Sequence, residues 1–354
     1  MNIAIVVTKL TLSGGMERYS LDLIKGLNEK GIMPFVLTSR FDKKLLSLVD
    51  FKPIIINRPK ILGKLGIHFF NFKLNYYKRK YHIDLLVACN RNTSSEIAIC
   101  GGTHIGFLKA INKKPKIWDK IEIALEKRMY SKAKYIIAHS NLMAAELKEL
   151  YKIEESKVKV IYPPINNNVF HPINDDDRKS IRQQNNWSDG DIILLFPSSG
   201  HERKGLPYII SSIKKSSNRD KIKLIVLGKY NSKYKEDFVL FHDFRSDIES
   251  LYQAADFTVL ASVYEPFGLV GPESVLCATP CLFSENIGAT EVLSHTSCHI
   301  FSVTNEENSL CKVLDNLEQL RIRIENQNSH IRYDISLSSH SQKLIELLFN
   351  KKVN

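Results

Sequence analysis

Short apolar runs alternate with amphipathic helical stretches along both halves of this 354-residue chain. In the first half, the apolar run 3–7 precedes a helical stretch, 16–30, whose apolar residues fall on one face and which stops at Gly31. In the second half, the stretch 191–200 has the pattern of a strand and its loop, and 206–215 that of a helix. Strands that alternate with helices form a parallel sheet covered by helices. The pattern therefore predicts an α/β protein made of two Rossmann-like units.

The other apolar runs continue the same alternation. Further strands are expected at 34–39, 52–57, 84–90, 135–140, 157–165, 221–228, 238–244, 256–262, 280–284 and 299–303. Further helices are expected at 69–80, 118–133, 142–151, 247–255, 272–278 and 339–349. Ser140 or Asn141 has the side chain that caps the helix at 142–151.

The two halves meet in the proline- and asparagine-rich segment 163–172. We expect an N-terminal domain over 1–168, a C-terminal domain over 169–330, and a final helix within 331–354 that packs back on the N-terminal domain. Ligands of such sheets bind at the carboxyl ends of the strands. Two domains of this kind that face each other would hold the ligand in the cleft between them.

Composition restricts the class of protein and the compartment. The apolar start of the chain is interrupted by Lys9 and is too short for a secretory signal, and no run approaches the ~20 apolar residues of a spanning helix. The six cysteines follow no zinc-ligand spacing, so we expect reduced thiols in a cytoplasmic protein. The net charge is +12, with much of the excess between Arg58 and Lys134. Nucleic acid, an anionic membrane and an anionic substrate are all compatible with this charge.

Arg203 and Lys204 lie just before the helix at 206–215, after an expected strand. Cations oppose the dipole at a helix N-terminus, and an anion held by both side chains and by backbone N–H groups would remove this conflict. The alternative is a pair of solvated surface charges. The loop lacks the pattern of a P-loop, which argues against that class of ATPase.

Gly14 and Gly15 follow the first strand. Residues without a side chain let the backbone approach a ligand closely, although the pair could equally form a tight turn. The spacing is not G-x-G-x-x-G, so it does not predict a dinucleotide site.

Two glutamates are separated by seven residues in "EPFGLVGPE", residues 265–273. Glu265 precedes a proline and is expected in extended backbone, whereas Glu273 follows a proline and falls in the first turn of a helix. Glu273 could simply stabilise that helix start, and Glu265 could be an exposed loop acid. However, carboxylates accept paired hydrogen bonds from vicinal hydroxyls, and Gly268 and Leu269 would offer backbone N–H groups between them. We interpret the pair as a sugar-binding element.

The elements "SGGMER", "VIYPPINNNVFHP", "SSGHERKG" and "EPFGLVGPE" together resemble the retaining glycosyltransferases of family 4, which have the GT-B fold. The resemblance covers nearly the whole chain. It implies that Glu273 binds the donor ribose, Glu265 the transferred sugar, and Arg203 and Lys204 the diphosphate. The full donor-binding set that it implies is Gly14, Gly15, Arg203, Lys204, Glu265, Phe267, Gly268, Leu269 and Glu273. No metal cofactor is expected, because two cations and backbone amides would stabilise the departing nucleoside diphosphate.

His104, in "CGGTHIGFL", resembles the active-site histidine of the family, although Thr103 could take that position and a lone histidine is more often structural. The catalytic set is therefore expected to comprise His104, Glu265, Arg203 and Lys204. The link between the strands at 221–228 and 238–244 is shorter than is usual in the family, which predicts that a peripheral helix is missing.

"RKG" and the stretch 118–140 are similar to enzymes that build the lipopolysaccharide core. This similarity implies a nucleotide-sugar donor and a saccharide or lipid-linked saccharide acceptor. It also leads to the hypothesis that the basic stretch 58–134 docks the enzyme on the inner face of the cytoplasmic membrane. A solvated helix face would explain the same charges.

Three other functions are open to a chain of this kind. A GT-B-like epimerase is not expected to combine the two glutamates with the glycine pair, and a phosphorylase would need a lysine for pyridoxal phosphate. A basic nucleic-acid-binding protein would explain the charge, but it would leave both loops and both glutamates without a purpose, and no RNA-binding signature is present. The sequence does not predict an oligomeric state.

Overall fold

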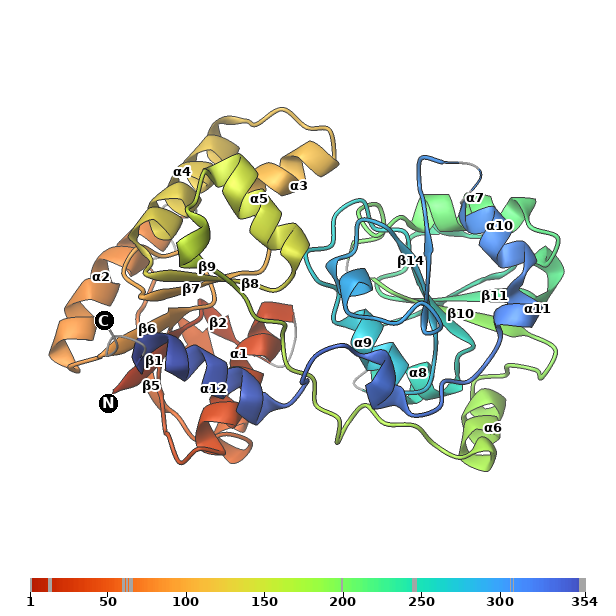
Figure 1. Ribbon diagram of the computed structural model, residues 1–354, viewed down its shortest axis with the longest axis horizontal. Helices are drawn as coiled ribbons and strands as arrows, with labels where there is room; N and C mark the ends of the chain where they lie inside the picture. The colour runs from red at the N-terminus through yellow and green to blue at the C-terminus, as the bar shows by residue number, and fades with distance from the viewer. Residues whose placement is uncertain are drawn as a thin grey trace. The chain divides into compact units, whose positions relative to one another are not determined.

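The structure is a computed structural model that describes residues 2–349, except 12–14, 59–60, 62, 64–65, 199, 244–246, 306 and 308. The chain forms two compact units (Figure 1). Unit 1 comprises Met1–Pro164 and Asp334–Asn354, and unit 2 comprises Ile165–Tyr333. Each unit contains a parallel sheet with helices around it, so the predicted fold class, two Rossmann-like α/β domains, is confirmed.

Unit 1 contains a seven-stranded parallel sheet. Its strands are β1 (Ile3–Val6), β3 (Phe35–Thr38), β5 (Lys52–Ile55), β6 (Leu85–Ala88), β7 (Ile97–Cys100), β8 (Tyr135–Ala138) and β9 (Val158–Val160). They lie in the order β5-β3-β1-β6-β7-β8-β9. The helices are α1 (Gly15–Asn28), α2 (Gly66–Lys80), α3 (His104–Ala110), α4 (Ile117–Lys132), α5 (Asn141–Tyr151) and α12 (Leu337–Phe349). The short strands β2 (Lys9–Leu10) and β4 (Arg40–Phe41) pair separately.

Unit 2 contains a six-stranded parallel sheet. Its strands are β10 (Ile192–Pro197), β11 (Ile222–Leu227), β12 (Val239–His242), β13 (Phe257–Leu260), β14 (Cys281–Ser284) and β15 (Cys298–Phe301). They lie in the order β12-β11-β10-β13-β14-β15. The helices are α6 (Asp175–Gln184), α7 (Leu206–Lys215), α8 (Ile248–Ala254), α9 (Val270–Leu276), α10 (Leu310–Asp315) and α11 (Leu317–Leu320). Between β11 and β12 the described residues form a single 3-10 turn, Ser232–Tyr234, as the short link predicts.

The last helix, α12, packs against α1 within unit 1 (Figure 1). Gly26 permits this contact, because a Cβ at that position would overlap the Oγ of Ser341 and lie 2.7 Å from the carbonyl oxygen of Leu337. Leu344 and Ile345 complete the core between α1 and the sheet. A fully buried side chain of this size contributes about 1.5–3 kcal/mol, so α12 is an integral part of unit 1.

A polar contact also holds α12 in place. The Tyr19 hydroxyl of α1 lies 2.8 Å from Nε2 of His340, whose Nδ1 lies 2.9 Å from the carbonyl oxygen of Tyr162. A carbonyl only accepts, so Nδ1 of His340 donates and its Nε2 accepts from Tyr19. The ring of His139 packs on Tyr19 at 4.7 Å between centroids. Burial lowers the pKa of His139 to about 3 and that of His340 to about 4, and both rings are therefore neutral in the folded protein.

Several elements lie outside the sequence expectations. The sequence pattern did not indicate β7, α3 or α6, although Asn174 caps α6 and Asp175–Asp177 occupy its first turn. Ser140, one of the two candidate caps, accepts from the backbone N–H of Met143. The cysteines are free thiols and all but the half-buried Cys311 are buried, in agreement with the expected reduced core. Among the described helices, none has both the length and the apolarity needed to cross a bilayer.

Candidate functional site

The loop after β10 brings Arg203 and Lys204 to the end of the neighbouring strand β13. The backbone N–H of Ala261 donates to the carbonyl oxygen of Lys204, and that of Val263 to the carbonyl oxygen of Arg203, both at 3.1 Å. Gly205 ends the loop with a φ of 81°, and a Cβ there would overlap the carbonyl oxygen of Ala261. Only glycine fits this close approach in the left-handed region. The loop is therefore held in one place by backbone contacts.

Both cations of this loop face Glu265. Arg203 donates through Nη1 to Oε2 of Glu265 at 2.9 Å and to the carbonyl oxygen of Tyr264 at 2.8 Å. Lys204 lies 4.0 Å from the same Oε2 and donates to the carbonyl oxygen of Pro197 at 3.1 Å. The fold thus gathers three of the predicted site residues at the carboxyl ends of β10 and β13, where ligands of such sheets bind.

Lys204 is the more enclosed of the two cations, with 9% of its surface exposed. Burial lowers the pKa of its ammonium group, while Glu265 and Glu273 raise it and Arg203 lowers it further. Two carboxylates and two cations therefore compensate one another in the protein alone. The side chain of Arg203 is 29% exposed, and an anionic ligand can bind the guanidinium group from this exposed side.

The segment that carries Glu265 is held by the residues after β14. The backbone N–H of Glu265 donates to the carbonyl oxygen of Asn286. In return, the backbone N–H groups of Gly288 and Ala289 donate to the carbonyl oxygens of Glu265 and Phe267, respectively. Gly268 has a φ of 90°, and a Cβ at this position would lie 2.9 Å from Cγ2 of Ile287. Glycine is therefore required by the fold at 268. The extended backbone expected for Glu265 forms an isolated parallel bridge with Ile287.

Glu273 lies in the first turn of α9, as its position after a proline predicts, and only 6% of its surface is exposed. The hydroxyl of Tyr252, from α8, lies 3.4 Å from its Oε2. A buried carboxylate is costly unless it is paired or has strong donors. Because it is buried, Glu273 is not simply a solvated acid that stabilises the start of α9. Phe267 is buried and Leu269 is half-buried immediately before α9.

In unit 1, Gly14 lies outside the described residues, and Gly15 begins α1. A Cβ at Gly15 would meet no atom within 4 Å, and its φ is not in the left-handed region. Folding of the described chain therefore does not require glycine at position 15. The next residue, Met16, lies close to Gly101, because a Cβ at Gly101 would be 2.9 Å from the Sδ of Met16; the start of α1 and the loop before α3 are therefore neighbours.

His104 is the first residue of α3, with an 18% exposed side chain. Its Nε2 lies 2.9 Å from Oδ1 of Asp119, in the first turn of α4. Its backbone N–H donates to Oε2 of Glu126 at 2.9 Å. Thr103, the alternative candidate, caps α3 through its Oγ1, which also donates to Glu146 at 2.6 Å. Thr103 thus has a structural role, and His104 has a defined orientation.

Sequence reasoning missed the acidic residues that surround His104. Asp119 and Glu126 belong to a stretch interpreted only as a basic, solvated helix, yet Glu126 is 1% exposed and is bound by Arg91 at 2.7 Å. The hydroxyl of Tyr151 also bonds Glu126. A signal was present, since Asp119 lies at the expected helix start, where acids are favoured. Its pairing with His104 depends on how α3 packs against α4 and could not be read from spacing.

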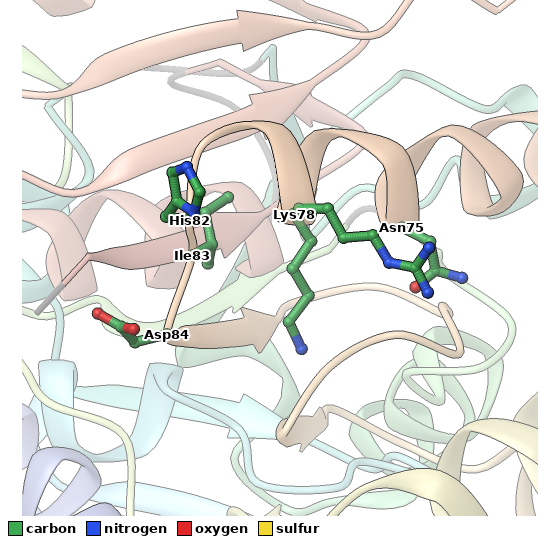
Figure 2. A pocket seen from close by; sticks show the side chains of 6 residues that line it. Asn75, Lys78, His82, Ile83 and Asp84 are labelled. Atoms are coloured by element: carbon green, nitrogen blue, oxygen red, sulfur yellow. The ribbon is translucent and has the colours of Figure 1, made fainter.

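A surface pocket of about 590 Å³ lies elsewhere in unit 1 (Figure 2). It is lined by Asn75, Lys78, Arg79, His82, Ile83 and Asp84. These residues end α2 and lead into β6, so the pocket is at the amino end of that strand. Ligands of parallel α/β sheets bind at the opposite edge, and none of the predicted site residues lines this pocket. We do not assign the donor to it.

The comparisons with known proteins divide the chain in the same way. Residues 13–169 match the model of Glycosyltransferase Family 4, and residues 177–333 match that of Glycosyl transferases group 1. A probable transglycosylase of Burkholderia thailandensis is 37% identical over 98% of this chain and 96% of its own length.

Solved structures share the fold. WaaG, a glycosyltransferase involved in lipopolysaccharide biosynthesis, superposes with a TM-score of 0.81 at 17% identity, over 98% of this chain and 99% of its own. Anabaena HepE in complex with UDP and glucose superposes with a TM-score of 0.77 at 18% identity, over 99% and 100%. The chain therefore belongs to the family 4 glycosyltransferases and has the GT-B fold.

Proposed function

We propose that this glycosyltransferase moves a sugar from a nucleotide-sugar donor to a saccharide or lipid-linked saccharide acceptor, with retention of the anomeric configuration. The observation that carries the proposal is the convergence of Arg203 and Lys204 on Glu265 at the start of α7. Two adjacent cations beside a helix N-terminus suit a diphosphate. A carboxylate beside them suits the hydroxyls of the sugar attached to that diphosphate.

Each residue has a proposed role in this reaction. Arg203 and Lys204 bind the diphosphate and stabilise the charge that develops as the nucleoside diphosphate leaves, so that no metal is needed. Glu265 accepts hydrogen bonds from the transferred sugar, and Glu273 from the ribose. The rest of the proposed donor-binding set is Phe267, Gly268 and Leu269 in unit 2, with Gly14 and Gly15 in unit 1. His104 is the remaining candidate catalytic residue.

The space around Gly15 supports its assignment to the donor-binding set. The fold has room for a side chain there, so the presence of a glycine is better explained by a ligand that the backbone must approach. The complexes of HepE with UDP and glucose and with UDP-glucose support a uridine diphosphate sugar as the first donor to test.

The proposal is tested by incubating the protein with a panel of UDP-, ADP- and GDP-sugars and measuring release of the nucleoside diphosphate. We expect release with one base and one sugar, unchanged by EDTA. Product formed on a saccharide acceptor should keep the anomeric configuration of the donor, which proton NMR coupling constants report. Release that EDTA abolishes and Mg²⁺ or Mn²⁺ restores would contradict metal independence. An inverted product would contradict retention, and epimerised donor without release would favour the epimerase.

The acceptor is proposed to be a precursor of lipopolysaccharide or of another cell-surface glycan, used at the inner face of the cytoplasmic membrane. The similarity of fold to WaaG supports this choice, given the role stated for that protein. Exposure decides which residues of the basic stretch 58–134 can contact an anionic membrane surface. Within this stretch, Phe70 is buried in the core and Lys78 is bound to Glu96, so neither is available to contact a membrane.

The segment 111–118, which links α3 to α4 and includes the first two residues of α4, fits best among the described residues of the basic stretch. Its Lys113, Lys114 and Lys116 are exposed, and beside them Ile117 is 67% and Trp118 43% exposed. Lysines attract anionic headgroups, and a tryptophan prefers the interface between headgroups and hydrocarbon. We assign peripheral membrane contact to this segment.

A further inference from the structure

Each carboxylate oxygen of Asp119 accepts a hydrogen bond, one from His104 and the other from Lys116. Oδ1 lies 2.9 Å from Nε2 of His104, and Oδ2 accepts from the backbone N–H of Lys116 at 2.8 Å. The hydrogen bond from Lys116 lowers the pKa of the Asp119 carboxyl group most, and the hydrogen bond from His104 lowers it further. The group is therefore ionised at neutral pH and can only accept. Its partner nitrogen on His104 must carry the proton.

The position of that proton decides what the other side of the ring can do. A neutral imidazole protonated at Nε2 has a lone pair on Nδ1, which accepts a hydrogen bond. Among the described residues, His104 Nδ1 has no hydrogen-bond partner. The pair therefore leaves an acceptor for a substrate hydroxyl, provided that Asp119 keeps its charge.

The backbone of His104 is anchored independently of Asp119. Its N–H is bonded to Glu126, which is buried and bound by Arg91 and Tyr151. The following turn is capped by Thr103. Loss of the Asp119 contact would consequently free the imidazole ring to rotate, while the first turn of α3 would stay in place. A positioning role and a folding role can thus be separated by experiment.

We propose that Asp119 is a positioning residue that fixes the orientation and the tautomer of His104, so that Nδ1 faces the substrate as a hydrogen-bond acceptor. The inference rests on the proposed function, because it assumes that His104 contacts the donor or the acceptor. Asp119 need not touch the substrate. It acts through the ring, in the way that a carboxylate orients the histidine of a hydrolase triad.

Asp119→Asn is the discriminating variant, since an asparagine oxygen can still accept from the backbone N–H of Lys116 at the start of α4, whereas His104 meets either a neutral oxygen or an N–H donor. Glu122→Gln is the matched control. It is the same acid-to-amide change one turn later, at a residue whose pair with Arg91 is long, 3.5 Å, and partly exposed. A third variant, Asp119→Glu, keeps the charge.

The first measurement is the ¹⁵N spectrum of the His104 ring in the full chain without substrate, assigned with a His104→Gln variant. We expect the proton on Nε2 in the wild type and in E122Q, and a changed tautomer distribution in D119N. The second is turnover of the active nucleotide sugar. For D119N we expect kcat to fall about 10²-fold, the size of an acid–base or tautomer effect, with the donor KM within about twofold.

Wild-type kcat in E122Q and partial recovery in D119E would support the inference, provided that the melting temperatures are similar. A wild-type ring protonated on Nδ1 would overturn it, and so would equal kcat in D119N and E122Q. A wild type that releases no nucleoside diphosphate would instead overturn the proposed function. The ring spectrum would then still decide whether Asp119 sets the tautomer.

Discussion

The guanidinium group of Arg203 and the carboxylate of Glu265 form an ion pair at 2.9 Å although the residues belong to different loops. Both loops are fixed by backbone hydrogen bonds and by glycines at positive φ, Gly205 and Gly268. The pair is therefore assembled before any ligand arrives. Preorganised charges need little reorganisation when the transition state forms, and stabilisation of this kind is usually the largest single contribution to catalysis.

Arg203→Ala and Lys204→Ala should each reduce kcat strongly. Loss of one preorganised donor to developing charge typically costs ~10²–10³ in rate. We expect melting temperatures close to that of the wild type for Arg203→Ala, whose side chain is 29% exposed. Nucleoside diphosphate release under saturating donor measures the effect. Lys215→Ala, at the far end of α7 and exposed, is the control and should retain full turnover.

Glu273→Ala should weaken donor binding by about 10- to 100-fold, because a hydrogen bond to a charged group contributes ~1.5–3 kcal/mol. Calorimetric titration with the nucleoside diphosphate measures this directly. Tyr252→Phe is the control, since it removes only the hydroxyl 3.4 Å from Glu273 and leaves the carboxylate in place. An alanine variant that binds the nucleotide as tightly as the wild type would rule out the ribose role.

The elements that the sequence predicted well are those with local signals. The periodicity of α1 and the proline before Glu273 both depend on neighbours within one or two turns. The strand β7 was missed because a four-residue apolar run next to Gly101 and Gly102 is too short to distinguish from a loop. For α6, a sufficient local signal was present in the cap at Asn174 and in the three aspartates after it.

Only the resemblance to the family linked distant residues of the candidate site. It assigned Glu265 and Arg203 to the sugar and the diphosphate of one donor, and the structure brings the two residues together. The resemblance did not link His104 to Asp119, and the depth at which Lys204 is buried follows from packing over β13. Tertiary packing determines these features, and they cannot be predicted from the spacing of residues in the sequence.

Gly15→Ala should separate function from folding. A Cβ at this position meets no atom within 4 Å, and alanine is the better helix former, by about 1 kcal/mol in a helix interior. We therefore expect an unchanged or slightly raised melting temperature, together with a clear loss of donor affinity. Gly190→Ala, whose Cβ would also meet nothing, is the control for an open glycine in unit 2 and should alter neither quantity. Normal donor binding by Gly15→Ala would remove Gly15 from the proposed site.

Stability should decrease on mild acidification because of the two buried histidines beside Tyr19. Their folded pKa values, about 3 for His139 and about 4 for His340, lie below the ~6.5 of an unfolded chain. Below pH ~6.5 the unfolded state therefore binds protons that the folded state excludes, and each histidine lowers the free energy of unfolding by ~1.4 kcal/mol per pH unit. This loss continues until the folded pKa is reached.

Urea denaturation between pH 7.5 and 5 measures this slope. His340→Gln should be less stable than the wild type at pH 7.5, because it disturbs the bond to Tyr19, but its stability should depend less on pH. His295→Gln, at an exposed position, should keep the wild-type slope. The assignment fails if His340→Gln and His295→Gln lose stability equally between the two pH values.

Membrane contact should depend on the segment 111–118. Replacing Lys113, Lys114 and Lys116 together by glutamine should weaken binding to anionic vesicles by about 3 kcal/mol, roughly 100-fold, at ~1 kcal/mol for each lysine. Sedimentation with anionic and with neutral liposomes over a salt series measures the effect, and the wild type should bind only the anionic ones and be released by salt.

The apolar contribution is tested separately, because charge alone would hold the protein above the headgroups without inserting a side chain. Ile117→Ser should reduce binding, whereas Ile322→Ser should not, although the two isoleucines are almost equally exposed, at 67% and 68%. Ile322 lies in unit 2, outside the basic segment, so exposure is matched while position differs. An equal reduction in both variants would indicate nonspecific adsorption. Equal binding of the wild type to neutral and anionic liposomes would exclude the electrostatic mechanism, and the glycosyltransferase would then have to meet its acceptor without help from the lysines of this segment.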